Sequence, residues 1–198
     1  MLVSDSWLVT PSLYSAYYWY AIREYGTTED FLKVLRKEKT PPTESMLSGI
    51  EFEDKIRAVC EGRYTAAQDS DVEEIANLVK DGFWQERIKK ELDGNLLYGI
   101  ADVITPYMIY DIKFSSKYDF GKYDYSIQHL LYMYCTGIPH FKYLISDGKE
   151  VYIEEHSWSD TSLDTLKSRI FEMLSFILGF KEFKEAFESN WRVKNEKK

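Results

Sequence analysis

Residues 96–114 read LLYGIADVITPYMIYDIKF, two apolar runs joined around Thr105-Pro106. The second run, Met108 to Phe114, alternates with a period of two, which places Asp111 and Lys113 together on one face of a strand. Their charges then lie roughly 7 Å apart. Two charges on the inner face of a strand are costly unless they are paired or bind something. An edge strand whose charged face meets solvent is the alternative for this segment.

Asp102 is the one charge in the first run, which extends from Leu96 to Ile104. A lone aspartate in so apolar a strand needs a cation, a network of donors or an active site to hold it. If the two strands are neighbours in a sheet, the carboxylate of Asp102 lies beside that of Asp111. Repulsion between them predicts that Asn at either position raises the stability of the metal-free protein.

The segments around this stretch predict a layered fold. Phe83 to Leu92 alternates and Asp93-Gly94 is a strong turn signal, so three consecutive strands form a meander. Capping and apolar patterns predict helices at 10–25, 28–37, 43–61, 71–80, 125–136, 161–178 and on to about 190, and a second hairpin at 141–145 and 151–155. This order predicts an α/β (α+β) fold, a central mixed β-sheet flanked by helices, with a helical N-terminal part.

Composition limits the protein class. The 198 residues are 44% hydrophobic and 29% charged, which predicts one folded domain over residues 1–198 with a basic tail at 191–198. No apolar run is long enough to cross a membrane, and the first ten residues have no basic residue, unlike a secretory signal. Two cysteines are too few for a disulfide framework or an iron–sulfur cluster. We therefore expect a cytoplasmic protein with no membrane contact and no such cluster.

A third inward carboxylate is predicted in the helix at 43–61. At about 100° per residue, Glu53 falls in the apolar arc of Phe52 and Ile56, and Gly49 one turn earlier removes bulk from that face. A border position, with Glu53 in water or paired with Arg57, is equally open. Three carboxylates with a lysine two residues after the last suit Mg²⁺ or Mn²⁺, which activate water and neutralise a phosphate. The three histidines, in contrast, lack the short spacings of a zinc site.

Four motifs together resemble a known family. They are, in chain order, Gly49-x-x-x-Glu53, Gly99-Ile100-Ala101-Asp102, Asp111-Ile112-Lys113 and Gln128-x-x-x-Tyr132. As an ordered set they resemble the PD-(D/E)xK nuclease superfamily, and within it the RecB-like exonuclease group. The resemblance covers residues 49–132, and the helix opened by Thr10-Pro11-Ser12 is similar to the N-terminal helix of that group. The resemblance implies a restriction-endonuclease-like core.

The resemblance also implies roles for individual residues. It implies a site for Mg²⁺ (or Mn²⁺) built from three carboxylates and one backbone carbonyl, those of Glu53, Asp102, Asp111 and Ile112. It implies that Lys113 is the catalytic lysine, and that Gln128 and Tyr132 help to place the scissile phosphate. Without the resemblance, Gln128 and Tyr132 read equally well as a polar helix edge and a core aromatic.

DNA is the expected partner. The formal net charge of −8 excludes bulk attraction to nucleic acid, so DNA binding must be local. Ser115 and Lys117, with Lys122, follow the predicted catalytic strand and are the candidates for DNA contact. In the alternative, the lysines only solubilise a loop. Self-association or a recombination protein as a further partner is left open.

We therefore expect a metal-dependent deoxyribonuclease, an exonuclease of recombination or repair, with a phage or mobile element as one setting. Three alternatives remain. The chain is a catalytically silent DNA-binding module of the same fold, a site-specific endonuclease, or an interaction domain whose acids form a solvated cluster. A silent module is expected to lose an acid or the lysine, and this sequence keeps all four.

Overall fold

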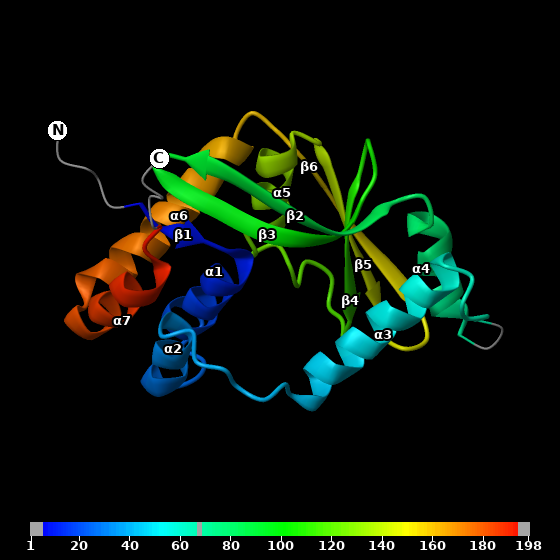
Figure 1. Cartoon of the computed structure of the whole chain (residues 1–198), viewed down its shortest axis with the longest axis horizontal. Coiled ribbons are helices and arrows are strands. Elements are labelled where there is room, and N and C mark those ends of the chain that lie inside the picture. The colour runs from blue at the N-terminus through cyan, green and yellow to red at the C-terminus, as the bar shows by residue number, and fades with distance from the viewer. Residues whose placement is uncertain (1–5, 67–68, 194–198) are drawn as a thin grey trace.

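The described part of the chain, residues 6–66 and 69–193 of a computed structural model, is built around one six-stranded mixed sheet (Figure 1). The strands are β1 (Leu8–Val9), β2 (Phe83–Leu92), β3 (Asn95–Ile104), β4 (Ile109–Phe114), β5 (His140–Ser146) and β6 (Val151–Ser157). Their order is β1-β3-β4-β5-β6, and β2 pairs with β3. β4 and β5 are parallel, whereas β5 and β6 form the predicted second hairpin.

The predicted meander of β2, β3 and β4 is confirmed. Within it, β3 and β4 pair only near the turn that joins them and then separate, and we call this separation the fork. β2 and β3 pair along their length through a tight turn in which Asp93 and Gly94 have φ values of 48° and 81°. The pairing of β4 with β3 is limited to the last residues of β3, Val103 and Ile104. β1 pairs with the first residues of β3, at Leu96 and Leu97. The stretch of β3 between these pairings includes Asp102 and has β2 as its only strand partner among the described residues.

Helices pack on both faces of the sheet. The helical segments are α1 (Pro11–Tyr17), the π-helix η1 (Tyr18–Ile22), α2 (Thr28–Leu35), α3 (Glu44–Cys60), α4 (Ser70–Val79), α5 (Gln128–Thr136), α6 (Ser162–Gly179) and α7 (Lys181–Trp191). Threonine caps set three of the predicted starts, because the hydroxyls of Thr10, Thr27 and Thr43 accept from backbone N–H groups of the first turn. The first predicted helix ends as a π-helix, which the apolar pattern does not reveal.

Two hydrophobic cores lie on the two faces. The larger core contains Leu131 of α5, Phe141 of β5 and Phe187 of α7. The smaller core joins α3 and α4 to the sheet through residues such as Ile56 and Leu144. Figure 1 shows α3 and α4 at one end of the molecule, with α1, α2, α6 and α7 grouped at the other. The architecture is the predicted α/β fold with a central mixed sheet flanked by helices.

The predicted basic tail at 191–198 is wrong at its start. Trp191 is 6% exposed and its indole N–H donates to the carbonyl of Leu35 at 2.9 Å. Arg192 forms an isolated β-bridge with Trp7, so aromatic burial and backbone pairing hold this segment in the fold. Residues 194–198 of the tail, and residues 1–5 of the segment compared with a secretory signal, lie outside the described residues. No described helix is long and apolar enough to cross a membrane.

Candidate active site

Asp111 is the most buried charged side chain of the site. It lies on β4, is 1% exposed, accepts a hydrogen bond from the Gln128 amide at 2.5 Å, and forms an ion pair with Lys113. β4 pairs with β5 along its length and with β3 at Ile109 and Tyr110, and Asp111 is buried, so the alternative of an edge strand whose charged face meets solvent is wrong. Ile112, between the two charges, packs into the smaller core on the opposite face. The predicted alternation is confirmed, and the flexible lysine side chain closes the expected 7 Å gap by folding onto Asp111.

Asp102 occupies the fork between β3 and β4. Its Oδ2 accepts a hydrogen bond from the backbone N–H of Ile112 at 2.8 Å, where β4 has left the β3 ladder. Burial, and then the charge of Asp111, raise the pKa of Asp102 well above its ordinary value, while Lys113 opposes the shift. The two acids therefore act on one another, as the sequence predicts for neighbouring strands.

Glu53 on α3 lies close enough to Asp111 and Lys113 to interact with their charges. It accepts a hydrogen bond from the side-chain amide of Gln85 on β2. Burial raises the pKa of Glu53, the Gln85 hydrogen bond opposes that shift, and the charge of Asp111 adds to it. The alternative pairing with Arg57 is wrong, since Arg57 contacts Glu61 at 3.0 Å. Glu53 is thus an inward, half-buried acid near the other two.

Gln85 is a site residue that the sequence did not single out. Its φ is 55°, a left-handed conformation that costs a residue with a side chain on the order of 1–3 kcal/mol. The β2–β3 pairing passes from Trp84 opposite Val103 to Glu86 opposite Ala101 and skips Gln85. Gln85 would face Asp102 there, and instead its amide contacts Glu53. The sequence carries no signal for it, because Gln85 is one of several polar residues in an alternating strand.

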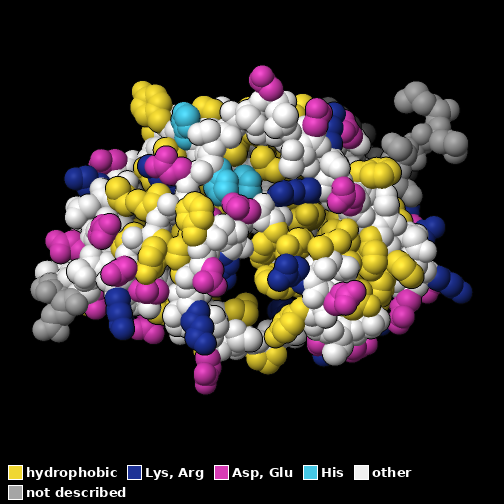
Figure 2. Space-filling view, turned by 180° about the vertical axis from the view of Figure 1, so that it is seen from behind, with side chains coloured by type: hydrophobic (Ala, Val, Ile, Leu, Met, Phe, Trp, Pro, Cys, Tyr) yellow, Lys and Arg dark blue, Asp and Glu magenta, His cyan; other side chains and the backbone are white. Residues whose placement is uncertain are grey.

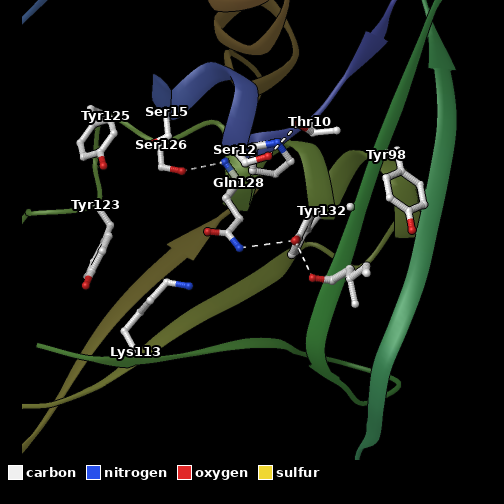
Figure 3. A pocket seen from close by; sticks show the side chains of 13 residues that line it. Thr10, Ser12, Ser15, Tyr98, Lys113, Tyr123, Tyr125, Ser126, Gln128 and Tyr132 are labelled. Carbon is white, nitrogen blue, oxygen red and sulfur yellow. Dashed lines mark hydrogen bonds between the residues drawn. The ribbon is translucent and has the colours of Figure 1, made fainter. Parts of the chain in front are cut away.

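Lys113, Gln128 and Tyr132 line a cavity of about 450 Å³ together with Thr10 and Ser12 at the start of α1 (Figure 3). In Figure 3 the amine of Lys113 and the amide of Gln128 point toward one another across it. The structure therefore brings the three predicted catalytic residues to one place. It also brings the start of the N-terminal helix there, which the sequence did not predict.

Tyr132 is both a core aromatic and a cavity residue. It is 3% exposed, and its hydroxyl donates to the carbonyl of Ile100 at 2.6 Å, within the stretch of β3 that pairs with β2 on one side only. A Cβ on Gly99 would lie 2.4 Å from the tyrosine ring, so only glycine leaves room for Tyr132 to reach β3. This packing explains the glycine in the motif that ends at Asp102.

Lys113 is held as a cation. Burial opposes its charged form, but the carboxylates of Asp111 and Asp102 outweigh burial and raise the pKa of Lys113 above its ordinary value. A lysine whose pKa is raised keeps its proton at neutral pH and cannot act as a general base there. The arrangement suits stabilisation of negative charge.

The three carboxylates predicted to bind the metal are near one another but not gathered into a closed cluster. Among the described residues, the one group of three such side chains with ligand atoms within 4.8 Å is Asp124, Glu154 and His156. Each acid instead has its own donor within the protein. Gln85 donates to Glu53, the Ile112 N–H donates to Asp102, and Gln128 and Lys113 contact Asp111. The raised pKa values of Glu53 and Asp102 reflect burial and the neighbouring negative charge, which a divalent cation would relieve. The donor set therefore fits a hard cation, and the role of the Ile112 carbonyl stays a prediction.

The predicted DNA-contacting residues lie in the loop after β4. The Ser115 hydroxyl donates to the carbonyl of Lys117 at 2.8 Å, and the Lys122 ammonium donates to the Ser115 hydroxyl at 2.6 Å. Ser115 is thus engaged within the loop, while Lys117 is exposed. Their contact with DNA stays a prediction.

Asp102→Asn should stabilise the metal-free protein at alkaline pH. An acid with a raised folded pKa lowers the free energy of unfolding as pH rises from its unfolded value through its folded value. Asn removes this loss and can still accept from Ile112. In EDTA at pH 8 the melting temperature of the variant should exceed that of the wild type, by about 2–4 °C for each kcal/mol gained in the free energy of unfolding. This difference in melting temperature should narrow towards pH 4. A lower melting temperature at pH 8 would contradict the electrostatic interpretation.

The sequence prediction that Asp111→Asn also stabilises the metal-free protein does not fit the structure. Asp111 is the ion-pair partner of a lysine and is almost fully buried, so removal of its charge leaves Lys113 without its closest counter-charge. Breaking one side of a buried pair is destabilising. We expect Asp111→Asn to lower the melting temperature in EDTA.

Comparison with known proteins gives matches at the level of structure. No family model matches the chain, and no curated protein matches its sequence. The "Putative exonuclease" from Eubacterium rectale is 17% identical with a TM-score of 0.54, covering 93% of this chain and 90% of that one. An alkaline exonuclease from Laribacter hongkongensis, LHK-Exo, is 13% identical with a TM-score of 0.53, covering 91% and 90%. LHK-Exo has also been solved in complex with dAMP, and that structure has a TM-score of 0.54. Over most of its length, the chain has the fold of these exonuclease structures.

Proposed function

We propose that this chain is a metal-dependent nuclease that hydrolyses phosphodiester bonds of DNA, and that it acts as an exonuclease. The observation that carries the proposal is the environment of Asp111, which is contacted by Lys113 and Gln128 beside Asp102 and Glu53. Two of its neighbours open onto a cavity that also receives the N-terminal helix. The likeness to exonuclease structures, one of them holding the DNA nucleotide dAMP, supports the same reading.

The acids supply a metal site. Glu53, Asp102 and Asp111, with the backbone carbonyl of Ile112, would hold Mg²⁺ or Mn²⁺. When bound, such a cation activates water and neutralises charge on the scissile phosphate. Gln85, through its hydrogen bond to Glu53, restrains that carboxylate on the inner side of α3.

Lys113, Gln128 and Tyr132 act from the cavity side. The Lys113 ammonium, fixed by Asp111, stabilises the negative charge that grows on the reacting oxygens. Gln128 is held by Asp111 and positions a phosphate group in the cavity. Tyr132 bonds to the free edge of β3 and keeps α5, which carries Gln128, at a fixed distance from the acids.

Aromatic residues beside the cavity favour a substrate with unpaired bases. Tyr125, which lines the cavity, stacks on Tyr18 with ring centres 4.2 Å apart and accepts a hydrogen bond from the indole of Trp19 at 3.1 Å. Aromatic rings at a surface are stacking platforms for unpaired bases, which are found at frayed DNA ends. This surface favours an exonuclease over a site-specific endonuclease, which needs groups that read base edges.

The setting we propose is recombination or repair in the cytoplasm, in a phage or mobile element or its host. It follows from the family resemblance. A second copy of the chain or a recombination protein would act with it.

Incubation with DNA tests the activity. End-labelled linear DNA and closed circular DNA are incubated with Mn²⁺, Mg²⁺ or EDTA. We expect labelled nucleotides to be released from linear DNA with either cation, circular DNA to stay closed, and EDTA to stop the reaction. Cleavage of circular DNA would favour the endonuclease alternative. DNA binding without cleavage under every condition would favour the silent module.

Lys117→Glu should weaken DNA binding. Measured in Ca²⁺, the dependence of log affinity on log salt should become shallower by about one unit if Lys117 contacts a phosphate. The control is Lys181→Glu on α7, where the lysine is 89% exposed and belongs to the other end of the fold. Equal behaviour of the two variants would place the DNA path away from the loop after β4.

Gln128→Ala should lower the cleavage rate at saturating DNA and leave the salt dependence of binding unchanged. Gln128 carries no charge, so its loss releases no counterion, whereas it positions one group at the reacting centre. Rate at saturation and affinity in Ca²⁺ are measured on the same preparation. A variant with weaker affinity and an unchanged saturated rate would show that Gln128 serves binding alone.

A further inference from the structure

A second group of side chains of the types that bind metals lies apart from the three predicted acids. Asp124, Glu154 and His156 bring one ligand atom each within 4.8 Å of one another. Glu154 and His156 are on β6, and Asp124 belongs to the loop before α5. On the face shown in Figure 2, histidine side chains reach the surface beside acidic side chains. The sheet register places Tyr143 of β5 between Asp111 and Glu154, so the two groups are separated by one strand.

Glu154 has one oxygen that is satisfied and one that is not. Its Oε1 accepts hydrogen bonds from the Tyr118 hydroxyl at 2.5 Å and the Gly121 N–H at 3.0 Å. Glu154 is only 3% exposed, and its Oε2 is buried without a hydrogen-bond partner. Nε2 of His156 lies 3.9 Å from Oε2, which is beyond hydrogen-bond distance. A buried carboxylate oxygen without a partner is costly and calls for a bound group.

His156 presents a second buried atom without a partner to the same point. Its Nε2 is buried and makes no hydrogen bond. The ring stacks on His129 of α5, with centres 4.0 Å apart and planes 13° apart, so its orientation is fixed from behind. Two unpartnered ligand atoms, one nitrogen and one oxygen, therefore converge beside the exposed carboxylate of Asp124.

We propose that Asp124, Glu154 and His156 form a second metal site that binds Zn²⁺. Imidazole nitrogen and carboxylate oxygen are both ligand types of zinc, and three such ligands leave a fourth position for water, whereas Mg²⁺ prefers oxygen ligands alone. Ligand atoms around tetrahedral zinc are about 3.4 Å apart. The ligand atoms here lie within 4.8 Å of one another, and the exposed side chain of Asp124 can rotate inward to shorten its distances to the other two. This site goes beyond the proposed nuclease activity and does not depend on it.

The site would fasten the loop before α5 to the sheet. Asp124 lies between Tyr123 and Tyr125, and both tyrosines line the cavity that contains Lys113. Glu154 already holds the loop through Tyr118 and Gly121. A cation shared by Asp124 and β6 adds a crosslink that orders this wall of the cavity. Its effect is on loop order and on stability.

Zinc titration of the full chain tests the site. All proteins carry Asp111→Asn, which disables the predicted catalytic metal site, so the nuclease proposal and this one fail separately. By calorimetry we expect one equivalent of Zn²⁺ to bind, and Zn²⁺ to raise the melting temperature. Adding Asp124→Asn, a change at an exposed position, should weaken Zn²⁺ binding at least about tenfold, since one of three protein ligands is lost. His156→Gln should do the same.

The matched control is Asp119→Asn, an exposed aspartate of the same loop that is outside the group. It should leave Zn²⁺ affinity and the thermal shift unchanged. Unchanged affinity in both the Asp124 and the His156 variants would overturn the proposal, as would the absence of Zn²⁺ binding to the starting protein. In either case a bound water or a protonated His156 would be what satisfies Glu154.

Discussion

Asp111→Asn should abolish DNA cleavage while the chain stays folded. The substitution keeps the volume of the side chain and removes its charge. Asp111 is 1% exposed and contacts both Lys113 and Gln128. The substitution therefore removes the charge of a proposed metal ligand and weakens the contacts that hold Lys113 and Gln128 in place. Metal stabilisation of charge is worth several kcal/mol, so we expect the rate with Mn²⁺ to fall by about 10³-fold or more.

The control for Asp111→Asn is Asp54→Asn. Asp54 follows Glu53 on α3 and is exposed. Its substitution therefore removes one negative charge close to the site without removing a residue of the site. Its cleavage rate should equal that of the wild type. Circular dichroism shows whether Asp111→Asn is folded at the assay temperature. A folded Asp111→Asn protein that cleaves DNA at the wild-type rate would remove the acids from the mechanism.

Lys113→Ala should lower the cleavage rate by roughly 10²-fold or more while Mn²⁺ affinity is kept or improved. The ammonium is bound to Asp111, and the raised pKa of Lys113 keeps it charged, so it repels a cation that shares this carboxylate. Loss of the lysine removes that repulsion and the stabilisation of the reacting oxygens together. Mn²⁺ affinity by calorimetry and single-turnover rate at saturating Mn²⁺ separate the two effects.

Lys142→Ala is the matched control for Lys113→Ala. Lys142 lies on the neighbouring strand β5, is 24% exposed and is paired with Glu155, so it is also a partly buried lysine in an ion pair. Its removal should change neither the rate nor Mn²⁺ affinity. If Lys113→Ala instead loses Mn²⁺ affinity and recovers its rate at high Mn²⁺, the lysine serves metal binding.

Local signals in the sequence were sufficient for most elements. The alternation of Met108 to Phe114 correctly places Asp111 and Lys113 on one face, because a strand has a period of two whatever its neighbours are. The turn at Asp93-Gly94 and the threonine caps depend on a few adjacent residues and are also confirmed. Glu53 faces inward as helical geometry predicts.

Features made by distant segments were not predictable in this way. The parallel pairing of β1 with the first residues of β3 joins residues almost ninety positions apart. Gln85 has a left-handed backbone and bonds to Glu53 of α3, and no local sequence signal indicates either feature. His156 and Asp124 meet across a loop and a strand, so no short histidine spacing announces them. The tail at Trp191 is held by Leu35 from the other end of the chain.

Anomalous diffraction from crystals soaked in Mn²⁺ tests the central claim most directly. The claim is that Asp102 and Asp111, on the two arms of the fork between β3 and β4, hold the cation that a nuclease needs. The account predicts an anomalous peak in contact with both carboxylates, which disappears in Asp111→Asn crystals. Full occupancy at Asp124, Glu154 and His156 with no peak at the fork, under conditions where the same protein cleaves DNA, would contradict it.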